Sequence, residues 1–285
     1  MRVTRPTGPA SKIAAAMLGA AVLLAPLAAA PASARGPEAD GVKVGNPSFI
    51  RKLYPAAKLE YTAAQQYQQL TAQAEAKHAL LPPEHPLTQR VRRIANELLP
   101  FANKFNDRAK DWDWKVNVLN SKTVNAFCMP GGKIAVYSGI VNELKLSDDE
   151  LALVMGHEIA HALREHARER AAKSMLTNVG VLAVGILVGN GAGELARVSG
   201  GLLGLKFSRG DESEADLVGM ELAARAGYDP RAGITLWEKM GAKAQGAPPQ
   251  WMSTHPSGPS RIDNIKKHLP EVMPIYERAK AERRQ

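Results

Sequence analysis

The 285-residue chain contains a single cysteine, Cys128, so it has no intramolecular disulfide. Cys128 stands between Phe127 and Met129, where the expected role is that of a small hydrophobic side chain in a core. An enzyme that uses a cysteine nucleophile is therefore not expected.

Clusters of basic residues are also missing. The formal net charge is +9, but lysine and arginine are scattered along the chain. Nucleic-acid binding needs such residues gathered on one face, so no nucleic-acid partner is expected. A mildly basic protein is still attracted to anionic membranes, which makes peripheral contact with an envelope membrane an expectation of the sequence.

Apolar runs long enough to cross a membrane are absent as well. A membrane-spanning helix needs about 20 apolar residues. The runs from Ile13 to Leu27 and from Val179 to Val188 are both shorter. The second run belongs to a glycine-rich segment, residues 178–206. A buried or lid-like helix with a glycine hinge is favoured there over a membrane-touching element.

Residues 1–34 have the three parts of a secretory signal. A basic start is followed by an apolar stretch and by the small-x-small cleavage site Ala32-Ser33-Ala34. A permanent membrane anchor is the alternative, and the cleavage site and the short apolar stretch argue against it. We expect export to the periplasm, a flexible leader over residues 35–54, and one domain over residues 55–285.

The remaining sequence favours a mainly helical α+β fold. Apolar residues recur at helical spacing over residues 87–105, and alternating strand-like runs surround the Gly131-Gly132 pair, which is typical of a hairpin turn. A further helix begins at the capping box formed by Ser147 and Glu150 and is expected to continue to about Met175. We predict a small antiparallel sheet beside this helix.

The sequence HEIAH, residues 157–161, lies on that helix. At about 100° per residue, His157 and His161 project from one face, one turn apart, so that both imidazoles can bind one zinc ion. Glu158 would stand beside the metal, where a carboxylate can act on a bound water. By itself the five-residue pattern is moderate support for a metal site.

A zinc hydrolase needs a third protein ligand and an open fourth position for water. His166 is the nearest candidate, but on a continuous helix it would lie about 180° from His157. We therefore exclude His166 and expect the third ligand from elsewhere in the chain.

Downstream, Glu212 and Asp216 lie one turn apart on a helix that is expected to begin near Arg209. One carboxylate can bind the metal while the other holds the second nitrogen of a ligand histidine. A solvated, acidic helix start is enough to explain Asp211 and Glu214, because the helix dipole favours negative charge there. It explains Asp216 less well, since Asp216 would face the apolar side.

Together with FSRGDESEADLVGMELAARAGYDP, the HEIAH motif resembles the HtpX, BepA and LoiP group of zinc metallopeptidases, peptidase family M forty-eight, whose pattern is H-E-x-x-H followed by E-x-x-A-D. The segment VNAFCMPGGKIAVYSGIV is similar to the family's Asn-Ala-Phe and Pro-Gly-Gly strand. STHPSGPSRI is similar to its Thr-His-Pro segment with an arginine beyond. The four motifs occur in the expected order.

The resemblance implies a zincin-like domain that holds one Zn²⁺ per chain through His157, His161 and Glu212. Glu158 would act as general base and acid, and Asp216 would orient a ligand histidine. His255 is similar to the family's additional histidine near the metal. It would either stabilise the oxyanion of the transition state or occupy the water position in a resting form, and an exposed loop histidine is the alternative.

The function implied is a zinc metalloendopeptidase that degrades unfolded or misfolded envelope proteins. Residues Asn125, Ala126 and Phe127 would bind an extended substrate as an added strand. The alternative is a chaperone-like protein that uses the same groove only to hold clients. Too few residues follow Pro270 for tetratricopeptide repeats, so docking through such repeats is not expected.

Overall fold

A computed structural model describes residues 40–283, apart from 189–201, 203–205, 245–248 and 256–258. The described residues belong to one compact unit, Gly36–Gln285. The expected signal, residues 1–34, and most of the glycine-rich segment lie outside the described residues. Within the part that is described, no helix has the length and apolar character needed to cross a membrane.

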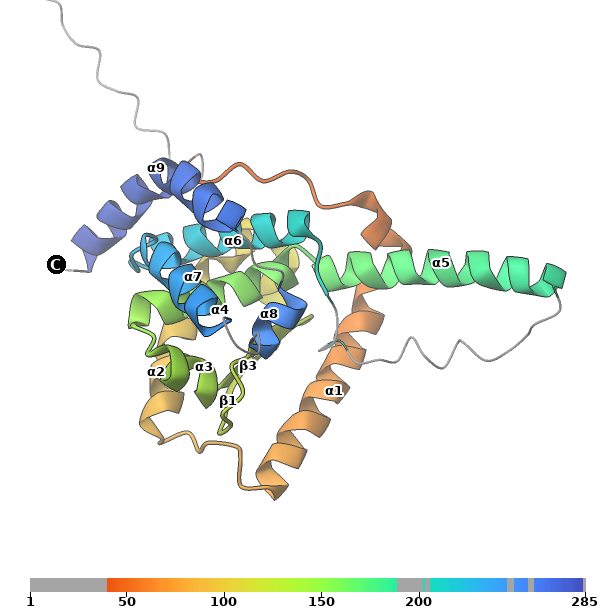
Figure 1. Ribbon diagram of the computed structural model, residues 1–285, viewed down its shortest axis with the longest axis horizontal. Helices are drawn as coiled ribbons and strands as arrows, with labels where there is room; N and C mark the ends of the chain where they lie inside the picture. The colour runs from red at the N-terminus through yellow and green to blue at the C-terminus, as the bar shows by residue number, and fades with distance from the viewer. Residues whose placement is uncertain (1–39, 189–201, 203–205, 245–248, 256–258, 284–285) are drawn as a thin grey trace, which may run out of the picture. The chain divides into compact units, whose positions relative to one another are not determined.

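The described chain is mainly helical, as predicted (Figure 1). In chain order its elements are η1 Phe49–Leu53, α1 Ala56–Ala76, α2 Pro86–Leu98, η2 Leu99–Lys104, η3 Asp107–Asp111, β1 Lys115–Leu119, β2 Ala126–Met129, β3 Lys133–Tyr137, α3 Ser138–Leu144, α4 Asp148–Leu163, α5 His166–Val188, α6 Arg209–Arg225, α7 Ala232–Lys243, α8 Gln250–Thr254 and α9 Pro259–Glu282.

The small sheet is mixed rather than antiparallel, which corrects one detail of the prediction. Strands β2 and β3 form the expected hairpin, and Gly131 and Gly132 in its turn have φ values of +78° and +80°, which favour glycine. Strand β1, however, pairs parallel with β3 in the order β1-β3-β2. The loop after β1 carries the chain past the place of β3, so β2 becomes the far edge strand.

Two predicted helices end early. The helix expected over residues 87–105 gives way to the 3-10 helix η2, whose second residue is Pro100, because proline lacks an N–H group and crowds the preceding helical turn. The helix expected to reach Met175 ends at Leu163, and a new helix starts at His166. Between them Glu165 has the left-handed φ of +57°.

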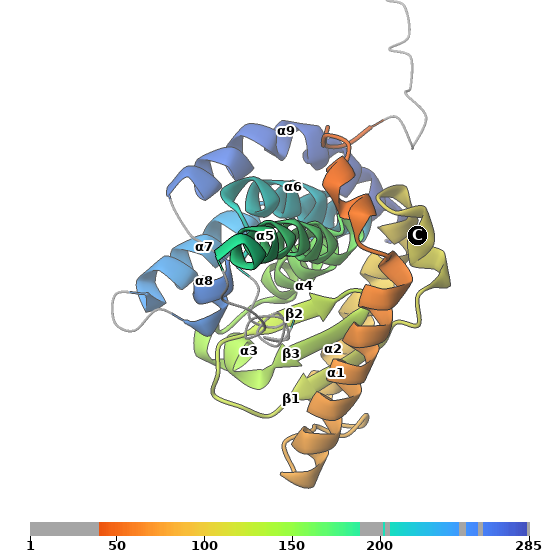
Figure 2. The same cartoon turned by 90° about the vertical axis from the view of Figure 1, so that its right-hand side faces the viewer.

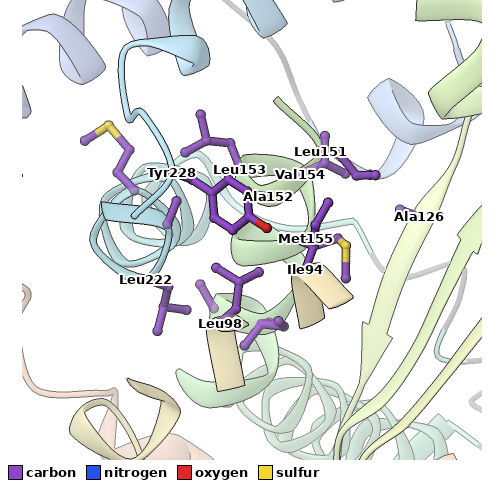
Figure 3. Packing of buried hydrophobic residues seen from close by; sticks show 14 of the residues in the cluster. Ile94, Leu98, Ala126, Leu151, Ala152, Leu153, Val154, Met155, Leu222 and Tyr228 are labelled. Carbon is purple, nitrogen blue, oxygen red and sulfur yellow. The ribbon is translucent and has the colours of Figure 1, made fainter. Parts of the chain in front are cut away.

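Helix α4 is the centre of the domain. Every residue from Glu150 to Leu163 is buried, and α4 lies between the sheet and α6 (Figure 2). Figure 3 shows Leu151 to Met155 of α4 packed with Ile94 and Leu98 of α2 and with Leu222 and Tyr228. The functional part of α4 is thus held by the main core.

Helices α4 and α6 approach closely where Gly156 faces Gly219. A Cβ atom at Gly219 would lie 2.7 Å from the backbone nitrogen of His157, and one at Gly156 would lie 2.8 Å from the carbonyl oxygen of Gly219. Only glycine at both positions permits this separation. The crossing places the N-terminal half of α6 beside the two histidines of α4.

Residues 40–54, part of the segment for which the sequence predicts a flexible leader, make specific contacts with the domain. The Val42 N–H group donates to buried Glu221 Oε2 at 2.8 Å, Arg164 donates to the Gly45 carbonyl oxygen, and Arg51 Nε pairs with Glu165 Oε2 at 2.6 Å. The proline, glycine and charged residues of this segment predicted mobility from its composition alone. Its partners lie more than a hundred residues away, so the sequence pattern could not show them.

Candidate metal centre

The start of α4 is fixed by the capping box that the sequence predicts. Glu150 N–H donates to Ser147 Oγ at 3.2 Å, and Ser147 N–H donates to Glu150 Oε2 at 2.8 Å. From this start, His157, Glu158 and His161 follow toward the C-terminal half of the helix, each with only 3% of its surface exposed. The buried core therefore holds all three polar side chains in place.

Helix α6 brings Glu212 to the two histidines. One Glu212 oxygen lies 3.5 Å from His157 Nε2 and the other lies 3.5 Å from His161 Nε2. The two Nε2 atoms are 3.0 Å apart. These three residues therefore turn their donor atoms toward a common point.

His255, which follows α8, joins the same group. Its Nδ1 atom lies 3.0 Å from Glu212 Oε1 and 3.3 Å from His157 Nε2. One donor atom from each of His157, His161, Glu212 and His255 lies within 4.8 Å of the others, and all four residues are buried. Imidazole nitrogens with one carboxylate oxygen are donors that Zn²⁺ prefers, so the set fits one zinc ion.

The charges in the group favour an ionised carboxylate. Burial disfavours a charged His157, but hydrogen bonds to Asp216 and Glu212 outweigh it and raise the pKa of His157 to about 9. Burial and the nearby His157 lower the pKa of His161. Burial would raise the pKa of Glu212, but hydrogen bonds to His157 and His255 hold it well below its usual range. A cation can thus replace the proton on His157.

Asp216 and Arg261 support the group from behind. Asp216 Oδ1 lies 3.1 Å from His157 Nδ1, on the side of the ring away from Glu212. Arg261 Nε donates to Asp216 Oδ2 at 2.7 Å and Nη1 donates to Glu212 Oε2 at 2.6 Å. Two buried carboxylates one turn apart need such a cation, and Arg261 is the arginine that follows the Thr-His-Pro segment in the sequence.

Glu158 has a partner that the sequence did not reveal. Trp251 Nε1 donates to Glu158 Oε1 at 2.5 Å, and His255 Nε2 lies 3.5 Å from the same oxygen. The Trp251 and His255 rings are stacked, with centroids 4.9 Å apart. No local pattern around Trp251 indicates this contact.

The geometric reason for excluding His166 is wrong. Because α4 ends at Leu163 and Glu165 is left-handed, His166 turns back and its Nδ1 atom lies 2.9 Å from His161 Nδ1. His166 is not a member of the converging four-residue group. It contacts that group from the outside, on the nitrogen of His161 that faces away from Glu212.

The strand residues expected to bind substrate lie next to the group. Strand β2 is an edge strand, and Asn125, Ala126 and Phe127 line one cavity together with Glu158 and His255. Cys128 lines the same cavity and is partly buried. Among the described residues no strand pairs with the outer edge of β2, which is where an extended chain could be added.

Several known proteins are similar in sequence to this chain. The mitochondrial metalloendopeptidase OMA1 of Arabidopsis thaliana is 40% identical over 173 residues, which cover 60% of this chain and 35% of that protein. OMA1 of Schizosaccharomyces pombe is 37% identical over 196 residues, covering 68% of this chain and 56% of that protein. The beta-barrel assembly-enhancing protease of Escherichia coli is 28% identical over 203 residues, which cover 66% of this chain and 40% of that protein.

This chain therefore spans 35% to 56% of the length of these three relatives. The model of peptidase family M48 matches residues 86–269, which is more than half of the chain and includes the whole four-residue group. The protein belongs to peptidase family M48.

Proposed function

We propose that the protein is a zinc-dependent metalloendopeptidase. The observation that carries this proposal is the convergence of His157, His161 and Glu212, with Glu158 beside them, in a buried group. Its relatives include a metalloendopeptidase and a protease, which supports the same activity. Binding a client without cleavage would not require Glu158, which argues against the chaperone-like alternative.

His157, His161 and Glu212 would hold the Zn²⁺ ion, which when bound lowers the pKa of water and polarises a carbonyl group. Glu158 accepts the proton of the attacking water and passes it to the amine that leaves. Asp216 holds His157 through Nδ1, so that Nε2 faces Glu212. Arg261 donates to both Asp216 and Glu212, and its positive charge favours the ionised form of these carboxylates.

His255 would occupy the water position in a resting form of the site. Its ring contacts His157 and Glu212, and its Nε2 lies near Glu158, so four donors converge where a hydrolase needs three and an open position. Of the two roles open to His255, this arrangement favours the resting one. Substrate entry would require the segment that carries His255 and Trp251 to move.

Cleavage of unfolded casein tests the proposal. We expect the wild-type protein to cleave it and Glu158→Gln to lose about 10²-fold or more in rate, because general-base catalysis contributes that much. Zinc content measured on the same samples should be equal. Equal cleavage by both proteins would overturn the mechanism, and prevention of client aggregation without any cleavage would favour the chaperone-like alternative.

Glu212→Gln tests the third ligand without measuring activity. A neutral amide is a poor zinc ligand, so we expect zinc to be retained less well against a chelator than in the wild type. Glu169→Gln removes the same charge in the first turn of α5, outside the metal group, and serves as the control for the role of a direct ligand. Equal zinc occupancy in Glu212→Gln and the wild type would show that the third ligand lies elsewhere.

We further propose that the substrates are unfolded or misfolded envelope proteins and that residues 1–34 direct export to the periplasm. The free edge of β2 beside Glu158 supports binding of an extended chain, since such pairing reads backbone rather than side chains. The secretory pattern of residues 1–34 supports export. Mass spectrometry of the N-terminus of exported protein should find cleavage after Ala34, and an intact Met1 would contradict it.

Peripheral contact with an anionic membrane is also proposed. Four large hydrophobic side chains are exposed on η1 and α5, two elements that pack together. They are Phe49 (70% exposed) and Leu53 (44%) of η1, and Met175 (39%) and Leu176 (47%) of α5. Figure 1 shows η1 against α5. Residues 49–54 and 165–177 hold five basic and two acidic residues, an excess of three positive charges.

Vesicle flotation tests this contact. We expect the wild type to bind vesicles that contain anionic phospholipid more than neutral ones, and Phe49→Glu with Leu176→Glu to reduce this binding. Tyr61→Glu is the matched control, because Tyr61 is 66% exposed but belongs to α1 and not to either of these two elements. Equal binding by all three proteins would overturn the proposal, and a change in oligomeric state would favour a protein partner instead.

A further inference from the structure

The turn between α4 and α5 holds a buried chain of polar side chains that the proposed mechanism does not use. His166 lies between His161 and Glu214, and Arg164 contacts Glu214 from the other side. We propose that His166, held by Glu214, is a positioning residue that fixes which nitrogen of His161 faces the metal group.

The hydrogen bonds themselves determine where the protons lie. His166 Nε2 is 2.8 Å from Glu214 Oε2, and a carboxylate can only accept, so the proton is on His166 Nε2. In the neutral form of the His166 ring, Nδ1 is then an acceptor. It lies 2.9 Å from His161 Nδ1, which must therefore be the donor.

The consequence is a lone pair on the correct nitrogen. With its proton on Nδ1, neutral His161 has a free lone pair on Nε2. That Nε2 atom lies 3.0 Å from His157 Nε2 and 3.5 Å from Glu212 Oε1, at the centre of the four-residue group. The chain from Glu214 through His166 thus prepares His161 to bind a cation.

Glu214 is held by a second donor. Arg164 Nη2 donates to Glu214 Oε1 at 2.6 Å, so both oxygens of this carboxylate accept hydrogen bonds. Arg164 also donates to the Gly45 carbonyl oxygen, which connects the chain of contacts to the N-terminal segment.

His161 is further fixed in the plane of its ring. Phe207 stacks on it with centroids 4.0 Å apart and an angle of 24° between the rings. His161 and His166 are each 3% exposed, so water does not replace either partner. The two ligand histidines therefore have different supports: a carboxylate for His157, and an imidazole backed by a carboxylate for His161.

Two nearly isosteric substitutions of His166 test the role. The amide oxygen of His166→Asn lies close to where Nδ1 was and can accept from His161, whereas His166→Leu has no acceptor. Zinc affinity would be measured by competition with a chelator, and the Co²⁺ absorption spectrum would report on ligand geometry. We expect a loss of about 10- to 100-fold for His166→Leu, and only a few-fold loss for His166→Asn.

Glu214→Gln is a second variant that leaves His166 in place. Its amide N–H group can donate to His166 Nε2 and reverse the proton arrangement, so we expect a loss of zinc affinity between those of the two His166 variants. Glu169→Gln, in the first turn of α5 but outside this chain of contacts, should leave zinc affinity unchanged. Thermal unfolding of metal-free protein would be compared for every variant.

Equal losses in His166→Leu and His166→Asn would overturn the proposal, as would no loss in either. A fall in metal-free stability that accounts for the whole loss would also overturn it, and Glu214→Gln decides the matter if a His166 variant does not fold. The proposal rests on the proposed metal centre. Failure of the wild type to bind zinc would reject that centre, whereas equal affinities of variants and wild type would reject only the role of His166.

Discussion

The two sides of the metal group are built in different ways. On the helix-paired side, formed by α4, α6 and α9, long helices meet at Gly156 and Gly219, and buried Arg261 binds both Glu212 and Asp216. On the α8 side, a five-residue helix supplies Trp251 and is attached by individual hydrogen bonds. The first side fixes the position of the ligands, and on the second we propose that the segment of Trp251 and His255 controls what reaches them.

Removal of Arg261 should have the largest effect on the helix-paired side. Arg261→Met leaves two buried carboxylates without their cation, and we expect the free energy of unfolding of metal-free protein to fall by about 3–5 kcal/mol. Chemical unfolding measures this. Arg231→Met removes an arginine whose side chain is 58% exposed in its pair with Asp229, and it should change stability little because solvent screens an exposed pair. Similar losses in both would mean that this side is not held by buried charge.

Gly219→Ala tests the close approach of α4 and α6. The added Cβ would lie 2.7 Å from a backbone nitrogen, which cannot move aside alone, so we expect a loss of about 2 kcal/mol and weaker zinc binding. Gly241→Ala is the control, because nothing lies within 4 Å of its Cβ position in α7. It should instead gain about 0.5–1 kcal/mol from helix propensity. A gain in both would show that the two helices can separate freely.

The α8 side should respond in activity more than in stability. His255→Ala removes one hydrogen bond to Glu212, for which we expect about 1 kcal/mol. It also opens the fourth position, so cleavage of unfolded casein should rise by about tenfold if the open form is normally the minor one. A fall in kcat with unchanged KM would show that His255 instead stabilises the transition state.

The smallest effect is expected at the start of α4, where it depends on pH. Burial would raise the pKa of Glu150, but hydrogen bonds to Lys239 and to the Ser147 backbone lower it below 4.5. A lowered folded pKa contributes stability above pH 4.5 and loses it as the pH falls through the folded value. Glu150→Gln should cost about 1 kcal/mol near neutral pH, and the difference from wild type should shrink in acid. A difference that stays constant with pH would contradict this.

Much of the helix-paired side could be predicted because its signals are local. The capping box of Ser147 and Glu150, the spacing of His157 and His161, and the one-turn separation of Glu212 and Asp216 are all consequences of helix geometry. The hairpin at Gly131 and Gly132 is equally local. For each of these, the neighbouring residues in the chain supply the structure.

The errors occurred where a distant contact overrides the local pattern. Residues 164 and 165 continue a helical pattern, yet Asn106 Nδ2 donates to the Leu163 carbonyl oxygen and Arg51 binds Glu165, so α4 ends there. The mixed order of the sheet also depends on a strand pairing that no short pattern encodes. The argument that helix rotation turns His166 away from His157 failed for the same reason, although His166 is not one of the four converging residues.

The sequence by itself determined the family, the mainly helical α+β class and the polar residues that can bind zinc, because motif spacing on a helix depends only on its 3.6-residue period. The tertiary structure alone decided which side chains support them. Arg261 reaches Asp216 and His157 across 45 and 104 residues of the chain, Trp251 reaches Glu158 across 93, and Glu214 reaches His166 across 48. Only the packing of α4 with α6, α8 and α9 brings these side chains together.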